Sequence, residues 1–356
     1  MCKQLSRKIV ARFHALVTYT TLPVLAPPKP PFRTLFNHMA KYKMILDLDT
    51  GVDDALALAW AVADPRVDLI GIISSYGNTL VDTAAQNSLN LLHLLGADEV
   101  PVFLGESHSS TTDSFETMEI SMLIHGRNGV GDVTLPTAPR AVESQHAVDF
   151  LIEAAHQYGD DLIFIPTGPL TNLAAAIQKD PAVANLIGNT TLMGGALTVP
   201  GNVTPFTEAN IHQDPEAADY AFTRQKNLTM VGLDVTLRTL LTKAETAQWR
   251  ALGTEKAEKF ADLMDYYIDA YFDLGIDKKG AALHDPLAVA VGIDPTYVTT
   301  IPLAMRVTYD RESGDYGRTI GDKEKLLEPT TTKAAVLVDT PRFVADFQDI
   351  MLTVLK

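Results

Sequence analysis

The sequence predicts an α/β fold: an open, mostly parallel, Rossmann-like sheet flanked by helices, with a helical C-terminal part. The first observation is that, from Met44 onward, short apolar segments alternate with longer Ala-rich or amphipathic segments. The second is that the apolar segments end in polar or glycine-rich loops. Such alternation is typical of parallel strands that are covered by helices on both faces.

The expected elements follow one another along the chain. The strands are short apolar runs, which indicates burial on both faces, at residues 44–46, 69–74, 100–104, 162–165, 190–193 and 228–232. Helices are expected between them, where the segments are longer and rich in Ala and Leu, at residues 53–63, 84–95 and 147–156. Beyond Asp234 the chain is expected to be helical, with its longest amphipathic stretch over residues 242–275.

Composition limits the classes of protein that fit. The 356 residues are 46% hydrophobic, enough to bury a sizeable core. A net charge of −15 disfavours binding to nucleic acid or to anionic membranes, so the expected ligand is a small molecule. No segment approaches the roughly 18 apolar residues of a membrane span. The single cysteine, Cys2, fits a reducing compartment, and we expect a cytoplasmic protein whose metal ligands are oxygen or imidazole.

The first 43 residues differ from the rest of the chain. They hold eight basic residues and no acidic one, and five prolines fall between positions 23 and 31. A basic, acid-poor leader is typical of a targeting segment. The prolines instead favour a disordered or spurious N-terminal extension, with the folded domain starting near Met39 or Met44. We favour the second interpretation and predict one folded domain over residues 44–356.

Four carboxylates lie within eight positions after the first predicted strand, at Asp47, Asp49, Asp53 and Asp54. Their mutual repulsion is costly unless a cation is bound, and Ca²⁺ takes six to eight oxygen ligands at about 2.3–2.6 Å. The alternative is a helix start, because acids favour the positive end of the helix dipole. That alternative accounts for Asp53 and Asp54 but not for the other two.

Polar loops also follow several later predicted strands, at residues 76–78, 166–172 and 193–195, and the last is followed by a polar segment at 201–210. In parallel sheets of this kind, ligands bind outside the carboxyl ends of the strands. The amides and carboxylates of these loops suit a polyhydroxylated ligand. A further acidic motif, His284-Asp285-Pro286, is as typical of a helix start as of a site.

In their order along the chain these motifs resemble those of the nucleoside hydrolase family, the ribohydrolases called inosine-uridine preferring. The resemblance runs from about Met44 to the C-terminus and begins with a D-x-D-x-G-x-D-D pattern, from Asp47 to Asp54. It implies a nucleoside hydrolase catalytic domain over residues 44–356 and a bound Ca²⁺. The implied metal ligands are Asp49, which also acts as general base, Asp54, the carbonyl of Thr167, and Asp285.

The resemblance also implies roles for residues that contact the substrate. Asn78 would orient the water, Asp53 would hold the ribose hydroxyls and Met193 would line the ribose. Three residues keep the family's spacing and would bind the 5′- and 3′-hydroxyls: Asn202, Glu208 and Asn210. Two histidines, His284 and His125, match positions near the leaving base. Thr50 stands where proline is common in the family, a difference that we expect to be harmless.

The implied reaction is hydrolysis of the N-glycosidic bond of ribonucleosides of the inosine, uridine and cytidine type. Asp49 would deprotonate the water and His284 would assist departure of the base, without a covalent intermediate. Relatives in the family form homodimers or homotetramers. Thr79, beside Asn78, and the lack of a nearby tryptophan favour a nonspecific or pyrimidine-leaning enzyme. Tyr267 and Tyr271 share a helix face and either border the base or pack in the core.

Two other functions compete with this interpretation. The Asp47-Leu-Asp49-Thr50 segment resembles the nucleophile loop of haloacid dehalogenase-type phosphatases, but those enzymes do not need Asp53 and Asp54 at this spacing. A non-catalytic ribonucleoside-binding protein could also keep a structural metal. Binding alone needs neither a base nor an acid, so Asp49 and His284 together favour the hydrolase.

Overall fold

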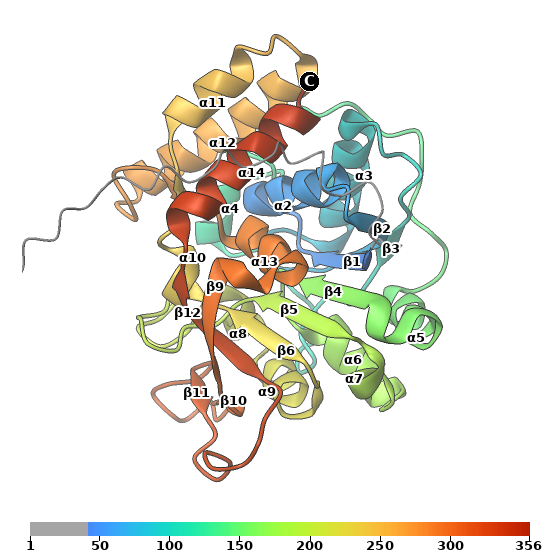
Figure 1. Ribbon diagram of the computed structural model, residues 1–356, viewed down its shortest axis with the longest axis vertical. Helices are drawn as coiled ribbons and strands as arrows, with labels where there is room; N and C mark the ends of the chain where they lie inside the picture. Colours follow the sequence, from blue (N-terminus) through green and yellow to red (C-terminus); the bar gives the residue numbers. More distant parts are fainter. Residues whose placement is uncertain (1–41) are drawn as a thin grey trace, which may run out of the picture. The chain divides into compact units, whose positions relative to one another are not determined.

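A single eight-stranded sheet organises the computed structural model, which describes residues 42–356 (Figure 1). The strands lie in the order β3-β2-β1-β4-β5-β6-β12-β9, and all neighbours are parallel except β9, which runs antiparallel to β12 at the edge. Their bounds are β1 Tyr42–Leu48, β2 Val67–Ser74, β3 Val102–Leu104, β4 Leu162–Pro166, β5 Asn189–Met193, β6 Leu228–Val231, β9 Val298–Pro302 and β12 Lys333–Val338. The predicted fold class is confirmed.

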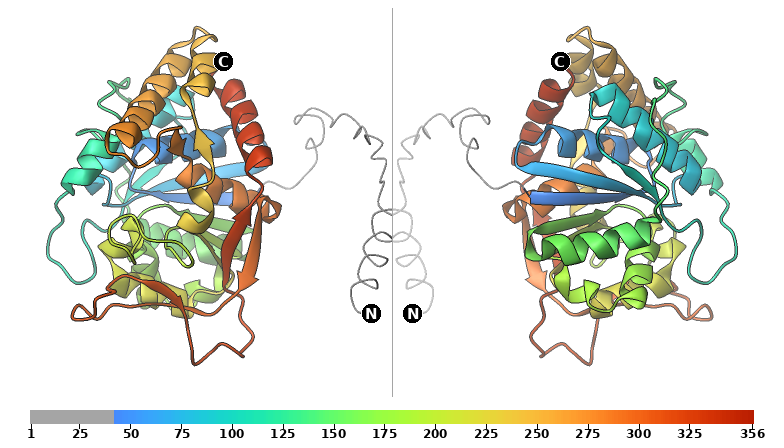
Figure 2. Two further views of the ribbon diagram at one scale, coloured as in Figure 1. Left: turned by 90° about the vertical axis from the view of Figure 1, so that its left-hand side faces the viewer. Right: turned by 90° about the vertical axis from the view of Figure 1, so that its right-hand side faces the viewer.

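Helices cover both faces of the sheet, and in both views of Figure 2 the strands lie between the two helical layers. One layer contains α2 (Val52–Ala63), α3 (Val81–Leu95), α12 (Glu255–Asp273), α13 (His284–Ile293) and α14 (Thr340–Val354). The other contains α5 (Ala147–Tyr158), α6 (Thr171–Lys179), α7 (Val183–Leu186), α8 (Ala209–Gln213) and α9 (Pro215–Arg224). Two short helices, α4 (Glu119–His125) and α10 (Leu233–Thr236), follow β3 and β6.

Strand β4 shows why the central strands are apolar without alternation. Leu162 and Phe164 belong to the hydrophobic cluster formed with α5, α6 and α9. The alternate residues Ile163 and Ile165 point to the opposite face, where they meet Gly292 of α13. A Cβ at Gly292 would lie 2.4 Å from Ile165 Cδ1, so α13 approaches the sheet more closely than a helix with a side chain there could. Successive residues of a strand face opposite sides, so both sets are buried.

The C-terminal part is less helical than predicted. The expected amphipathic stretch over 242–275 forms two helices, α11 (Lys243–Arg250) and α12, because Gly253 adopts a φ of +68° between them and Thr254 caps α12. The missed elements are strands β9 and β12 and two small pairs: β7 (Leu240–Leu241) with β8 (Ala281–Ala282), and β10 (Met305–Val307) with β11 (Thr319–Gly321). Four of these strands span only two or three residues, and β9 is half exposed at the sheet edge, so none of these five is a buried apolar run. Strand β12 has an apolar run at residues 334–338, but only its first two residues are buried.

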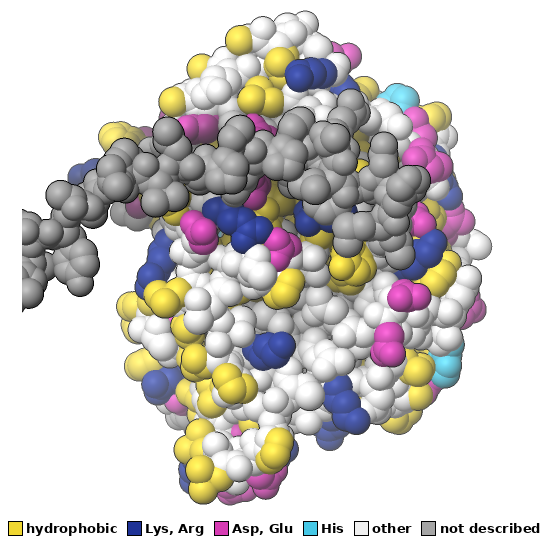
Figure 3. Space-filling model, in the orientation of Figure 1, with side chains coloured by type: hydrophobic (Ala, Val, Ile, Leu, Met, Phe, Trp, Pro, Cys, Tyr) yellow, Lys and Arg dark blue, Asp and Glu magenta, His cyan; other side chains and the backbone are white. Residues whose placement is uncertain are grey.

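The first strand includes the end of the predicted N-terminal extension. Strand β1 begins at Tyr42, so the last two residues of the predicted extension belong to it, and the rest of that extension lies outside the described residues. Within residues 42–356 no helix is both long and apolar enough to cross a membrane. On the face drawn in Figure 3, the visible basic, acidic and hydrophobic side chains of the described part are interspersed.

Candidate active site

Polar loops gather where the parallel strands end. The loops that follow β1, β2, β4, β5 and β6 begin at Asp49, Ser75, Thr167, Gly194 and Gly232. Because these strands are parallel neighbours, their carboxyl ends share one edge of the sheet, as expected for a ligand site in such folds. Helices α2 and α13 pack together and begin at this edge, with Asp53 and Asp54 in the first turn of α2 and Asp285 in the first turn of α13.

Asp54 is held firmly at the start of α2. Its Oδ2 accepts a hydrogen bond from the backbone amide of Gly51 at 2.7 Å, and its Oδ1 accepts one from the Thr167 hydroxyl at 2.7 Å. The side chain therefore links the loop after β1 to the loop after β4. A role at the start of α2 requires only the Gly51 bond, so the Thr167 bond is an additional contact that forms because the two loops meet.

Asp49 is fully buried and is fixed by one residue of the next loop. Its Oδ2 accepts from the Asn78 backbone amide at 2.7 Å, and its Oδ1 accepts from the Asn78 side-chain amide at 3.0 Å. Gly77 precedes Asn78 with a φ of +153°, and a Cβ there would lie 2.0 Å from Asp49 Oδ2. The turn between β2 and α3 can approach the carboxylate only because residue 77 is glycine.

Three carboxylates form a group suited to a cation. One oxygen from each of Asp53, Asp54 and Asp285 lies within 4.8 Å of the others, and all three side chains are buried. Asp53 Oδ1 is buried without a hydrogen-bond partner. Burial, reinforced by the charge of Asp54, raises the pKa of Asp53 to about 8. An unpaired oxygen among crowded, desolvated acids fits a hard divalent ion such as Ca²⁺.

This group differs from the ligand set expected from the sequence. It includes Asp53, which was expected to hold ribose, beside the expected ligands Asp54 and Asp285. Asp49 adjoins the group through Asp54: burial, and then the charge of Asp54, raise the pKa of Asp49 well above its usual value. Burial, and then the charge of Asp53, likewise raise the pKa of Asp285 well above its usual value.

A second set of residues surrounds the Thr167 carbonyl. The Asn210 side-chain amide donates to that carbonyl at 2.6 Å and lies 3.2 Å from the carbonyl of Met193. Glu208 caps α8, because its carboxylate accepts from the amides of Asn210, Ile211 and Gly195 at 2.9–3.2 Å. Asn202 lies on an exposed loop and accepts from the Ala209 amide at 3.0 Å. The three residues expected to bind the 5′- and 3′-hydroxyls thus lie on one loop and at the start of α8.

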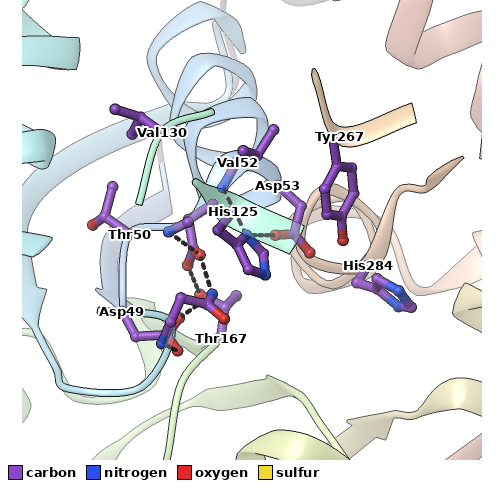
Figure 4. Close-up of polar contacts among 12 residues, drawn as sticks. Asp49, Thr50, Val52, Asp53, His125, Val130, Thr167, Tyr267 and His284 are labelled. Atoms are coloured by element: carbon purple, nitrogen blue, oxygen red, sulfur yellow. Dashed lines mark hydrogen bonds and ion pairs between the residues drawn. The ribbon is translucent and has the colours of Figure 1, made fainter. Parts of the chain in front are cut away.

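Two buried histidines complete the site (Figure 4). His125 Nδ1 accepts from the Val52 amide at 3.2 Å and lies 3.9 Å from Asp53 Oδ1, and burial lowers the pKa of His125 to about 3. Burial likewise lowers the pKa of His284 to about 4. In the view of Figure 4, Asp53 lies between the two rings. Both histidines are therefore neutral near pH 7.

The His284 ring is oriented through both nitrogens. Nδ1 lies 2.8 Å from the Thr236 hydroxyl, and Nε2 lies 2.9 Å from the Tyr271 hydroxyl. The Tyr271 hydroxyl is 3.2 Å from that of Tyr267, whose ring centroid is 5.4 Å from that of His125. Both tyrosines are buried on α12. They connect the two histidines: Tyr271 contacts His284, and Tyr267 contacts the ring of His125.

Several contacts were not predicted from the sequence. The Thr50 hydroxyl lies 2.8 Å from that of Ser88 on α3, so a threonine fits where the family often has proline. The Asn172 side chain donates to Asp47 Oδ1 at 3.0 Å, and the other Asp47 oxygen is buried without a partner. Mainly through burial, the pKa of Asp47 rises to about 8. The polar run at 166–172 was the one signal for Asn172; Thr236 and Ser88 had none.

An open parallel sheet with buried acids and amides at its carboxyl edge is the arrangement of α/β enzymes that bind small ligands. Comparison with known proteins defines the class further. Residues 44–345 match the family described as inosine-uridine preferring nucleoside hydrolase. A probable uridine nucleosidase 2 of Arabidopsis thaliana is 32% identical over 313 residues, which cover 86% of this chain and 96% of that protein.

Two further proteins match the chain over nearly their whole length. The pyrimidine-specific ribonucleoside hydrolase RihB of Escherichia coli strain SE11 is 35% identical over 307 residues, covering 86% of this chain and 95% of that protein. A solved structure, the purine-preferring ribonucleoside hydrolase from Gardnerella vaginalis, aligns with a TM-score of 0.86 and 51% identity over 88% of this chain and 99% of that chain. The chain belongs to the inosine-uridine preferring nucleoside hydrolase family. It is an N-ribosyl hydrolase. This function takes the place of the two alternatives considered above, a phosphatase and a non-catalytic binding protein.

Proposed function

We propose that this enzyme hydrolyses ribonucleosides of the inosine, uridine and cytidine type in a Ca²⁺-dependent reaction in which Asp49 activates the water. The observation that carries the proposal is the position of Asp49. Asn78 fixes both of its oxygens, and it adjoins three buried acids that include one unpaired oxygen. A rigidly held carboxylate at the edge of a cation site suits a general base.

The chain's own residues account for the other parts of the reaction. Asp54, Asp285 and the Thr167 carbonyl are proposed to hold the ion together with Asp49, and Asp53 to share its oxygens between the ion and the ribose hydroxyls. Bound there, Ca²⁺ would keep the acids ionised and lower the pKa of a water. Asn78 orients that water, and Asn202, Glu208, Asn210 and Met193 bind the ribose. His284 assists departure of the base, and His125 is the other histidine proposed near the base.

A comparison of sugars tests the substrate assignment. Ribose release from inosine, uridine and cytidine should exceed release of the sugar from 2′-deoxyuridine by at least about 10²-fold in kcat/KM, because a missing hydroxyl leaves buried polar partners unpaired. The ratio is measured by a reducing-sugar assay with uridine and 2′-deoxyuridine side by side. Equal rates on the two substrates would show that the ribose site is misassigned. The rates on the three ribonucleosides also decide the base preference. The relatives do not predict it, because one is described as pyrimidine-specific and another as purine-preferring.

Removal of the metal should abolish turnover and destabilise the protein together. Chelation leaves the buried acids without a counter-charge, and a ligand at a hundredfold excess over its Kd stabilises a fold by about 2.7 kcal/mol. We expect the unfolding temperature to fall by several degrees on chelation and to return with Ca²⁺. Calorimetry and elemental analysis measure this without an activity assay. Full activity after exhaustive chelation, with no bound divalent ion, would contradict the metal assignment.

Substrates with different leaving groups distinguish the roles of the two histidines. His284→Ala should slow inosine hydrolysis by about 10²–10⁴-fold and leave hydrolysis of 4-nitrophenyl riboside nearly unchanged, because a stable phenolate needs no proton. His125→Ala is measured on the same pair of substrates. An equal loss on both substrates for His284→Ala would assign it a structural role and make His125 the leading proton donor.

Oligomeric state and cellular location stay predictions. The family resemblance implies a homodimer or a homotetramer, and the single cysteine fits the cytoplasm. Light scattering on the purified protein decides the first, and fluorescence microscopy of the tagged full chain decides the second.

A further inference from the structure

We propose that Thr171 is a positioning residue for Asp49, held by Asp214 and acting through Tyr76 and the turn that carries Asn78. The inference rests on the proposed role of Asp49 as general base. Thr171, Asp214 and Tyr76 lie outside the acid cluster. Tyr76 and Thr171 fall in two of the polar loops noted in the sequence, but no role was predicted for any of the three. A series of hydrogen bonds runs from the buried Asp214 carboxylate through Thr171 to Tyr76, two residues before the Asn78 that holds Asp49.

Asp214 is a fully buried carboxylate with four donors. Ser110 donates from its backbone amide and from its hydroxyl, each at 2.7 Å; the Thr171 hydroxyl donates at 2.8 Å, and the Ala217 amide at 3.0 Å. Capping of α9 requires only the Ala217 bond. The other three bonds tie α9 to the loop after β3 and to the start of α6, so Asp214 joins three segments that are distant in sequence.

Thr171 has one hydroxyl proton, and this decides which group donates in its hydrogen bond with Tyr76. A carboxylate only accepts, so the single hydroxyl proton of Thr171 points to Asp214. The Thr171 oxygen then accepts from the Tyr76 hydroxyl, 2.9 Å away. Burial, with a contribution from the charge of Asp214, raises the pKa of Tyr76 above its usual value, so the phenol keeps the proton that it donates. Tyr76 is thereby fixed at its hydroxyl end.

Tyr76 in turn fixes the turn that holds the catalytic carboxylate. Its ring is fully buried, with its centroid 4.8 Å from that of Phe115. The next two residues are Gly77, which has no room for a Cβ beside Asp49, and Asn78, which donates to both Asp49 oxygens. A small rotation of Tyr76 therefore displaces both donors to Asp49, and errors of about 1 Å in such positions cost up to 10²-fold in rate.

The neighbouring residue supports the same role for the start of α6. Asn172 donates to Asp47 Oδ1 at 3.0 Å and accepts from the Glu106 amide at 2.7 Å. The first turn of α6 thus contacts the acid-bearing strand through Asn172 and the Asn78 turn through Thr171. The same two residues are connected to the loop after β3. Asn172 contacts Glu106 directly, and Thr171 is connected to Ser110 through Asp214.

The test compares Thr171→Val, which is isosteric but removes the hydroxyl, with Thr171→Ser, which keeps it. We expect Thr171→Val to lower kcat on uridine by about tenfold or more, with KM within about twofold, and Thr171→Ser to restore kcat. Tyr76→Phe should lower kcat similarly, and the double variant should be no worse than the poorer single one, because both break one chain. Tyr76→Phe carries the same expectation if Thr171→Val does not fold.

Thr246→Val is the matched control. It removes another hydrogen bond from a buried threonine to a carboxylate: Thr246 on α11 donates at 2.6 Å to the partly exposed Asp265 on α12. It should lower the unfolding temperature about as much as Thr171→Val and leave kcat unchanged. A normal kcat in Thr171→Val, a change in KM alone, or additive effects with Tyr76→Phe would overturn the positioning role while the wild-type enzyme still releases ribose. Absence of ribose release by the wild-type enzyme would overturn the proposed function as well.

Discussion

Asp49→Asn should lower kcat on uridine by about 10³-fold or more, because it removes the proposed base together with one charge of the cation site. Asparagine has nearly the same shape, so the fold should persist. One of its two side-chain atoms is a donor, however, and Asn78 presents donors to both positions. Steady-state kinetics measure the loss, and circular dichroism verifies the fold.

The control for this variant is Asp149→Asn on α5. Asp149 forms an exposed ion pair with Lys179 and lies outside the site. Exposed pairs contribute little to stability, and we expect kcat to be unchanged. An Asp49→Asn enzyme with turnover within tenfold of the wild type would exclude Asp49 as the base.

Gly77→Ala should have the next largest effect. The added Cβ would lie 2.0 Å from Asp49 Oδ2, and a φ of +153° is unfavourable for alanine. Asp49 cannot yield without losing its two bonds to Asn78, so the turn itself must shift. We expect kcat to fall by about 10²-fold and stability by about 1–3 kcal/mol, measured by kinetics and by denaturant titration.

Gly96→Ala separates backbone strain from the clash. Gly96 ends α3 with a φ of +75°, and a Cβ there meets nothing within 4 Å. The variant should lose about 1 kcal/mol of stability and no activity. If Gly77→Ala kept normal kcat, the close approach of the turn to Asp49 would have no catalytic importance.

The sequence predicted the central sheet because its strands are buried on both faces. Strands such as β4 then have no polar residue in their apolar runs, and such runs are the strongest pattern that a single sequence offers. Strand β12 follows a polar loop and pairs with β9, and β9 is half exposed. Their pairing depends on contacts between distant segments, which a local pattern does not encode.

The residues of the site likewise divide into those that the sequence predicted and those that only the folded chain brings together. Four acids within eight positions are costly in any fold, so the motif indicated a cation before any geometry was known. The grouping of Asp53 with Asp54 and Asp285 depends on how α2 and α13 meet. Asp214 and Thr236 lie beside other polar residues in short helices and their flanks, where such residues are common, so only the folded chain shows what they contact.

The meeting of α2 and α13 has a consequence for synthesis of the protein. Asp54 leaves the ribosome well before Asp285, since 285 − 54 = 231 residues separate them. At about 5–20 residues per second, translation of that interval takes about 10–50 s. During this time the chain holds Asp49, Asp53 and Asp54 but lacks Asp285 of α13. The proposed set of ligands is therefore complete only after α13 has emerged, and we expect an unfinished chain, which lacks Asp285, to have no activity on the nucleosides of the cell that is making it.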